Sequence, residues 1–143
     1  FHLATHGLLN DFKGQGLPGA IALAPDGTGK RNDGLLTANE IFDLKLKAEL
    51  VVLSACDTGR GELTGDGVIG LSRALIQAGV PSIIVSLWAV DDASTAYLMQ
   101  QVYQKWEKTG DKAKALREAM LATKEQYRNP VYWAAFTLIG ESD

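Results

Sequence analysis

The sequence of 143 residues contains one cysteine, two histidines and four prolines. A single cysteine cannot form a disulfide within the chain, so nothing favours an oxidising compartment and we expect a cytoplasmic protein. A structural zinc site needs about four Cys or His ligands, and this chain is too poor in both residue types to supply one. We therefore expect no bound metal.

The sequence also has no long apolar run and no excess of positive charge. No apolar stretch reaches the roughly 18 residues that a membrane helix requires, and nothing resembles a signal peptide. The 14 basic and 17 acidic residues give a formal net charge of −3. Because such a chain has no general attraction for phosphate backbones or anionic lipid, we expect neither nucleic acid nor a membrane as its partner.

What the chain does have is the composition of an ordinary globular domain. Hydrophobic residues make up 46% and charged residues 22% of the sequence. Its length predicts one domain, residues 1–143, with a core large enough to fold without disulfides. The chain begins with Phe1 rather than Met, in a segment that already has the pattern of a strand. We therefore expect a fragment of a longer protein.

Strand-like and helix-like segments alternate along the sequence. Continuous apolar runs over residues 49–55 and 82–88 are typical of strands buried on both faces of a parallel sheet. Further strands are predicted over 1–6 and 133–139, and a hairpin over 19–36 that turns at Asp26-Gly27. Capping signals and apolar spacing predict four helices, which begin at Thr37, after Gly67, at Asp92 or Ser94, and at Asp111. This order predicts an α/β fold with a mainly parallel sheet and helices on both faces.

Reactive side chains lie at the ends of the predicted strands. His6 ends the first strand, and Cys56, the only cysteine, follows the strand at 49–55. In parallel sheets the carboxyl ends of strands share one edge, where ligands gather. An imidazole can take the proton of a thiol, which makes His6 a candidate base and Cys56 a candidate nucleophile toward an amide or ester carbonyl. The backbone N–H groups of Gly7 and Cys56 are candidate donors to the resulting oxyanion.

Other interpretations of these residues stay open. A lone cysteine at a strand end can also serve as a small buried hydrophobic residue or as a redox sensor. His2 is the alternative base, but His6 lies at the carboxyl end of the strand and precedes a glycine, so we expect His2 to be buried or paired. Asp91 and Asp92 are expected in the first turn of a helix, where the helix dipole favours acids.

Four segments resemble one known family. Ala55-Cys56, with a histidine 50 positions upstream, agrees with the caspase pattern of nucleophile and base, although Ser54 stands where that pattern has glutamine and one extra residue precedes Gly59. The segments HLATHG, VVLSACDTGRGE, GDGVIGLSRALIQAGV and SIIVSLWAVDD follow one another as in a CHAT domain, the separase-related branch of caspase-like peptidases. The chain resembles this family over nearly its whole length.

The resemblance implies a caspase-like three-layer sandwich that lacks one or more N-terminal strands in this chain. It also implies a catalytic dyad of His6 and Cys56, peptidase activity on protein substrates, and no metal or cofactor. CHAT domains are often found behind tetratricopeptide repeats, so such repeats are expected upstream as regulatory partners.

In caspase-like folds, the residue two positions before the nucleophile lines the pocket for the substrate side chain that precedes the cut. The resemblance therefore places Ser54 in that pocket. A neutral hydroxyl cannot by itself hold a buried cation, so specificity for a basic side chain would need a carboxylate. Asp57, Asp91 and Asp92 are the candidates, and Trp88 is expected to supply a wall against which the substrate packs.

The sequence thus predicts a cysteine endopeptidase that cleaves protein substrates with His6, Cys56 and a backbone oxyanion hole. One alternative is a catalytically silent caspase-like module that only binds a partner. Another is acyl transfer or deamidation by the same dyad.

Overall fold

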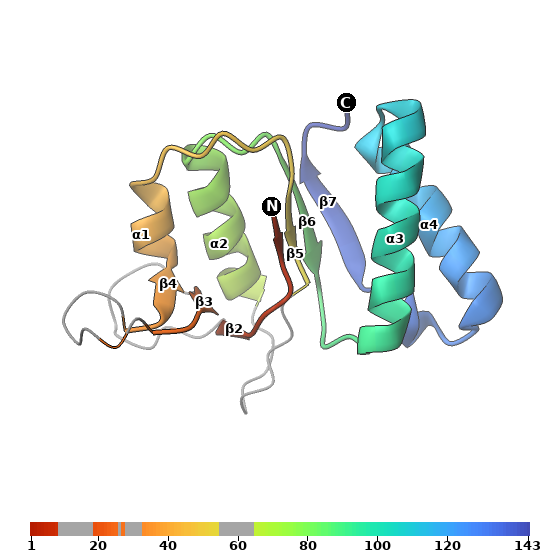
Figure 1. The fold of residues 1–143 in the computed structure, drawn as a ribbon, viewed down its shortest axis with the longest axis horizontal. Coiled ribbons are helices and arrows are strands. Elements are labelled where there is room, and N and C mark those ends of the chain that lie inside the picture. The colour runs from red at the N-terminus through yellow and green to blue at the C-terminus, as the bar shows by residue number, and fades with distance from the viewer. Residues whose placement is uncertain (9–18, 26, 28–32, 55–64) are drawn as a thin grey trace.

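A computed structural model describes residues 1–8, 19–25, 27, 33–54 and 65–143 of the chain (Figure 1). The larger of its two sheets has the strand order β1-β5-β6-β7. Its strands are β1 (His2–Leu3), β5 (Val51–Leu53), β6 (Ser82–Ser86) and β7 (Phe136–Gly140). β5 runs parallel to both β1 and β6, whereas β7 is antiparallel to β6. The predicted, mainly parallel sheet is therefore confirmed.

The smaller sheet is antiparallel and consists of β2 (Gly7–Leu8), β3 (Ala20–Ala22) and β4 (Leu35–Thr37). The pairing of β3 with β4 confirms the hairpin predicted over 19–36, although its expected turn at Asp26 lies outside the described residues. Gly34 has φ +80°, and a Cβ there would lie 2.8 Å from the backbone oxygen of Leu23. Glycine is therefore required where the chain enters β4.

Three of the four described helices begin after polar N-cap residues, Thr37, Asp91 and Asp111, whereas the second begins at Gly65 rather than after Gly67 as predicted. The helices are α1 (Ala38–Phe42), α2 (Gly65–Gln77), α3 (Asp92–Thr109) and α4 (Lys112–Gln126), with a 3₁₀ turn η1 (Pro130–Tyr132) before β7. Thr37 and Glu40 form the predicted capping box of α1. None of the described helices is long and apolar enough to cross a membrane.

The start of α3 differs from the prediction by one residue. Its N-cap is Asp91, rather than Asp92 or Ser94, and the Asp91 carboxylate accepts a hydrogen bond of 3.0 Å from the backbone N–H of Ser94. Asp91 keeps an extended backbone (φ −78°, ψ 136°), as an N-cap must, while Asp92 is already the first residue of the helix. The side chain of Asp91 is therefore engaged in holding the end of α3.

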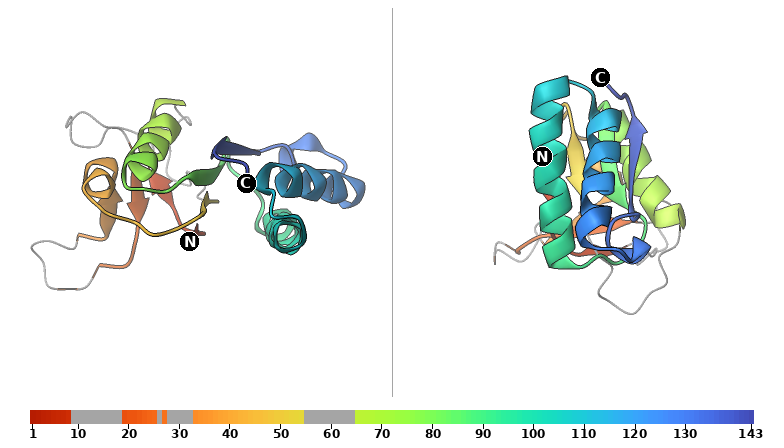
Figure 2. Two further views of the ribbon diagram at one scale, coloured as in Figure 1. Left: turned by 90° about the horizontal axis from the view of Figure 1, so that it is seen from above. Right: turned by 90° about the vertical axis from the view of Figure 1, so that its right-hand side faces the viewer.

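Two layers of helices cover the larger sheet (Figure 2). One core cluster joins α1 and α2 to one face of β5 and β6, through Val51, Leu53, Ile83 and Val85. The second joins α3 and α4 to the other face, through Val52 and Ile84. Alternate residues of each strand therefore point to opposite layers. This three-layer arrangement is consistent with the expected caspase-like sandwich.

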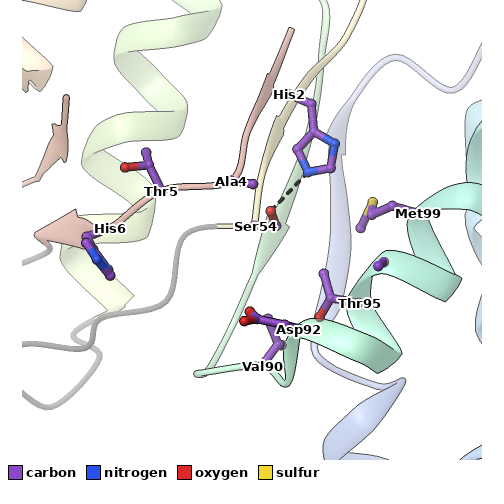
Figure 3. A pocket seen from close by; sticks show the side chains of 10 residues that line it. His2, Ala4, Thr5, His6, Ser54, Val90, Asp92, Thr95 and Met99 are labelled. Carbon is purple, nitrogen blue, oxygen red and sulfur yellow. Dashed lines mark hydrogen bonds between the residues drawn. The ribbon is translucent and has the colours of Figure 1, made fainter. Parts of the chain in front are cut away.

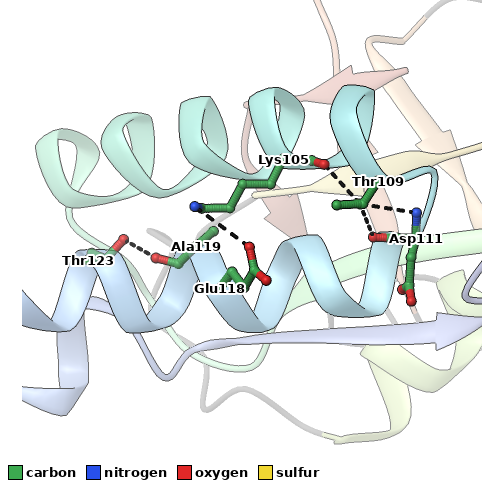
Figure 4. Close-up of polar contacts among 6 residues, drawn as sticks. All are labelled: Lys105, Thr109, Asp111, Glu118, Ala119 and Thr123. Atoms are coloured by element: carbon green, nitrogen blue, oxygen red, sulfur yellow. Dashed lines mark hydrogen bonds and ion pairs between the residues drawn. The ribbon is translucent and has the colours of Figure 1, made fainter.

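α3 and α4 form a tightly connected pair (Figure 4). Gly110 ends α3 with φ +71°, and the Thr109 hydroxyl donates to the backbone oxygen of Lys105 at 2.9 Å. An ion pair of 3.8 Å between Lys105 and Glu118 links the two helices. These contacts fix α3 as one wall beside the sheet.

The first strand is shorter than predicted. β1 ends at Leu3 rather than at His6, and the chain then bends toward the smaller sheet. Two hydrogen bonds hold the bend: the Thr5 hydroxyl donates to the backbone oxygen of Ala22 at 2.6 Å, and the N–H of Ala22 donates to the backbone oxygen of His6 at 2.8 Å. His2 and His6 consequently do not share one regular strand face.

Candidate functional site

A cavity of about 650 Å³ lies where β1 and β5 end, between the larger sheet and α3 (Figure 3). On the sheet side it is lined by His2, Ala4, Thr5, His6 and Ser54. On the helix side it is lined by Val90, Asp92, Thr95, Ala96 and Met99. This is the carboxyl edge of the parallel strands, where the sequence predicts a site.

Hydrogen bonds join His2 and Ser54, which line the cavity, to Tyr103 of α3, which is not among the described residues that line it. Because β1 pairs in register with β5, His2 lies opposite Val52, and Ser54 follows two positions later, just past the end of β5, toward the same face. Nε2 of His2 lies 3.0 Å from the Ser54 hydroxyl, and Nδ1 lies 3.1 Å from the hydroxyl of Tyr103 on α3. The paired role expected for His2 is therefore confirmed.

The environment of these three side chains keeps them uncharged at neutral pH. Burial lowers the pKa of the His2 ring below its usual 6.5, and the positive amino group of Phe1 lowers that pKa further. Burial also raises the pKa of the Tyr103 hydroxyl above its usual 10.0. The hydrogen-bonded group Tyr103–His2–Ser54 is consequently polar but neutral.

The lowered pKa of His2 predicts a loss of stability in mild acid. An unfolded His2 takes up a proton near its usual pKa, about 6.5, while the folded ring resists protonation until the pH is lower. The unfolded state then binds more protons, so the free energy of unfolding falls as the pH drops through this range. Urea unfolding at pH 8 and at pH 5.5 measures this loss, and His2→Gln should reduce it. If the free energy of unfolding fell equally in the parent and in His2→Gln, protonation of His2 would not be the cause of the loss.

His6 and Gly7 lie where the chain passes from the larger to the smaller sheet. His6 is exposed and lines the cavity, whereas Gly7 is buried in β2 opposite Ile21. The N–H of Ala22 donates to the backbone oxygen of His6, the residue before Gly7. Gly7 and Ile21 are therefore a cross-strand pair that exchanges no backbone hydrogen bonds. The N–H of Gly7 therefore points away from β3.

The other predicted site residues divide into three groups. Ser54 is buried, with 9% of its surface exposed, and lines the cavity as expected. Cys56 and Asp57 lie outside the described residues. Trp88 and Asp91 are not among the described residues that line the cavity, because the Trp88 indole donates to the backbone oxygen of Val131 at 3.0 Å and Asp91 caps α3.

The helix side of the cavity includes residues that the sequence analysis did not assign to a site. Thr95, Ala96 and Met99 line it together with Asp92, which was only one of three candidate acids. These four positions have the spacing i, i+3, i+4 and i+7, so they form one face of α3. Within the described ranges, no three acidic, His or Cys side chains group closely enough to hold a metal ion.

Comparison with known proteins agrees with this architecture. The family model of the CHAT domain matches residues 1–141. Two curated relatives are named tetratricopeptide repeat protein 28: the mouse protein is 36% identical and the human protein 37% identical, each over 108 residues and 74% of this chain. The chain spans only 4% of the length of either relative. The chain belongs to the CHAT domain family, which is related to the caspase-like cysteine peptidases.

Proposed function

We propose that residues 1–143 form one catalytic domain, that of a cysteine endopeptidase. The observation that carries this proposal is the shared register of the two strands that lead to His6 and Cys56. Leu3 of β1 lies beside Leu53 of β5. His6 follows Leu3 by three positions in the sequence, and Cys56 follows Leu53 by three positions. His6 lines the cavity, and so does Ser54, two residues before Cys56.

In this mechanism His6 takes the proton of the Cys56 thiol, and the thiolate attacks the carbonyl carbon of the scissile peptide bond. The carbonyl oxygen becomes an oxyanion that the N–H groups of Gly7 and Cys56 stabilise. The protonated His6 then gives its proton to the leaving amine as the C–N bond breaks. Water, deprotonated by His6, hydrolyses the thioester and releases the acid together with the restored thiol.

The position of Gly7 supports its role as a donor. Its N–H points away from β3, so the antiparallel ladder does not consume this donor. A glycine directly after the base also leaves room for the substrate, because it has no Cβ to crowd the carbonyl.

The proposed partners are a protein or peptide substrate and upstream tetratricopeptide repeats in the full-length protein. The names of the two curated relatives, which include such repeats, support the second partner. We also propose a cytoplasmic location, because the single cysteine cannot form an internal disulfide.

Covalent labelling of Cys56 tests whether its thiol is activated. At pH 7 a peptidyl acyloxymethyl ketone should modify Cys56 in the full-length protein, and His6→Ala should slow labelling about a hundredfold because the base is lost. Intact-protein mass spectrometry follows the rate, with a free thiol of ordinary pKa as the reference. Labelling no faster than this reference, in parent and variant alike, would instead support a silent interaction module.

The same preparation separates hydrolysis from acyl transfer and deamidation. Hydrolysis of a peptide bond yields two shorter peptides, one with a new carboxylate and one with a new amine. Mass spectrometry of the products should show these two fragments. A product in which the acyl group sits on another amine, or in which a glutamine has become glutamate, would assign the dyad to one of the other reactions.

A further inference from the structure

The outer edge of the larger sheet is unpaired among the described residues. β7 ends the strand order β1-β5-β6-β7, so it pairs with β6 on one side only. The N–H of Leu87 donates to the backbone oxygen of Ala135, so the backbone groups of Ala135 face the β6 side. Because these groups alternate in direction along an antiparallel strand, those of Phe136 and Leu138 point away from β6. Their N–H and C=O groups are therefore available to a further strand.

A groove of about 350 Å³ lies beside this edge, between β7 and α4. Figure 1 shows α4 beyond β7 at one end of the molecule, and Figure 2 shows the two elements side by side. On the helix side, the lining residues have the spacing i, i+3, i+4, i+7 and i+8, so they form one face of α4. They are Ala113, Leu116, Arg117, Met120 and Leu121. Leu121 is 45% exposed, so the groove presents apolar surface that the described fold leaves open to solvent.

The charge along this face of α4 is positive. Arg117 is exposed in the groove, and no described residue forms an ion pair with it. The neighbouring acid, Glu118, pairs instead with Lys105 of α3. Lys124 lies seven positions after Arg117 on the same face, with its Nζ 5.6 Å from the centroid of the Trp133 ring. The described lining contains no acidic side chain. A partner that brings a carboxylate would therefore complement the groove.

Trp133 adds an unused hydrogen-bond donor to the same groove. It is part of the lining, and its indole Nε1 is buried with no hydrogen-bond partner among the described residues. By contrast, the indole of Trp88 donates to the backbone oxygen of Val131. An unsatisfied buried donor is unfavourable, so an acceptor brought by a bound segment would be stabilising here.

We propose that the β7–α4 groove binds an extended segment of a partner protein in which an acidic residue stands between apolar ones on one face of the strand. The segment adds to β7 through the backbone groups of Phe136 and Leu138, as extended peptides do at exposed sheet edges. Its carboxylate pairs with Arg117, and its apolar side chains pack against Met120 and Leu121. This inference is independent of the proposed peptidase function.

Two features favour such a segment over other occupants. Unpaired backbone groups at a sheet edge can be satisfied by a strand, whereas a helix has already used its own backbone groups internally. A second copy of this chain, paired through its own β7, would bring no carboxylate within that strand, because Phe136–Gly140 contains no acidic residue. The charge of Arg117 would then stay without a partner.

Binding of a matched set of synthetic peptides to the full-length protein tests the proposal. The first peptide alternates threonine with valine, glutamate and valine, and the second has lysine in place of the glutamate. Fluorescence anisotropy should give a dissociation constant about tenfold lower for the glutamate peptide. Two further peptides keep the glutamate and carry N-methyl groups on one or the other set of alternate backbone amides. One set should weaken binding at least about tenfold and the other much less, because only every second amide of an added strand bonds to β7.

A charge reversal at Arg117 tests which residue reads the acid. Arg117→Glu should reverse the preference, so that the lysine peptide binds about tenfold more tightly than the glutamate peptide. Arg73→Glu makes the same change on α2, in the other helical layer, and should leave the preference for glutamate intact. Both arginines are exposed, so neither change should disturb the fold.

Hydrogen exchange of the full-length protein locates the bound peptide. The glutamate peptide should slow exchange of the Phe136 and Leu138 amides in the parent, and much less in Arg117→Glu. Absence of binding, a preference for glutamate that persists in Arg117→Glu, or protection confined to other segments would overturn the proposal. So would equal binding of the two N-methylated peptides, because it would exclude strand addition. A dimer in sedimentation experiments, with these amides protected before any peptide is added, would assign the edge to a second copy instead.

Discussion

Replacing Cys56 with alanine is expected to abolish peptide cleavage, lowering kcat by at least about a thousandfold, because no other group can form the thioester. His6→Ala is expected to cost about 10²- to 10⁴-fold, the usual contribution of a general acid and base. The full-length protein, incubated with a proteome-derived peptide library and followed by mass spectrometry, provides the measurement. The double variant should be no slower than Cys56→Ala alone, because the two groups act as a unit.

Loss of activity supports the dyad only if the variants remain folded. His6 is exposed, so His6→Ala should change the melting temperature by no more than a few degrees. We expect the same for Cys56→Ala. His2→Ala serves as a matched control, since it removes the other imidazole, and it should leave far more activity than His6→Ala. If His2→Ala were instead as inactive as His6→Ala while folded, His2 would take over the role of base.

The pattern of apolar residues was sufficient to predict the central sheet. The runs over 49–55 and 82–88 became β5 and β6, because every residue of these strands is buried between two helical layers. Capping signals likewise placed α1 at Thr37. Such features depend on residues that are close in sequence, and so they can be seen without coordinates.

The places where the prediction failed depend on contacts between distant residues. The first strand ends early because Thr5 bonds to Ala22, which is 17 positions away. η1 precedes β7, so that strand starts at Phe136 rather than at Trp133. Nothing in the local pattern of residues 1–6 or 133–139 reports these interactions.

The candidate site was predictable on the sheet side and only partly on the helix side. Strand ends lie at one edge in any parallel sheet, which brought Ser54 to the cavity as expected, and His6 lines the same cavity although β1 ends three residues before it. Thr95 and Met99 share a helical face that resembles an ordinary core face. Only the position of α3 against the sheet, fixed by its pairing with α4 and by the His2–Tyr103 bond, turns that face toward the cavity.

Ile84 is one of the fully buried residues of the sheet that holds this edge in place. Its side chain is 0% exposed, and its residue pairs with Val52 of β5 on one side and Leu138 of β7 on the other. It belongs to the core cluster that joins the sheet to α3 and α4. A smaller side chain would leave a space that neither neighbouring strand can close without breaking its ladder.

Ile84→Ala should therefore lower the free energy of unfolding by about 3–4 kcal/mol, and Ile84→Val by about 1 kcal/mol. Urea unfolding at pH 7 measures both changes. Ile76, which is 46% exposed on α2, provides the matched control, and Ile76→Ala should cost well under half as much as Ile84→Ala. Since native domains are stable by only about 5–15 kcal/mol, the loss at Ile84 amounts to a large part of the total. Equal losses at Ile84 and Ile76 would show that α3 and α4 are not held against the sheet through Ile84, and the placement of α3 beside Ser54 would lose its physical basis.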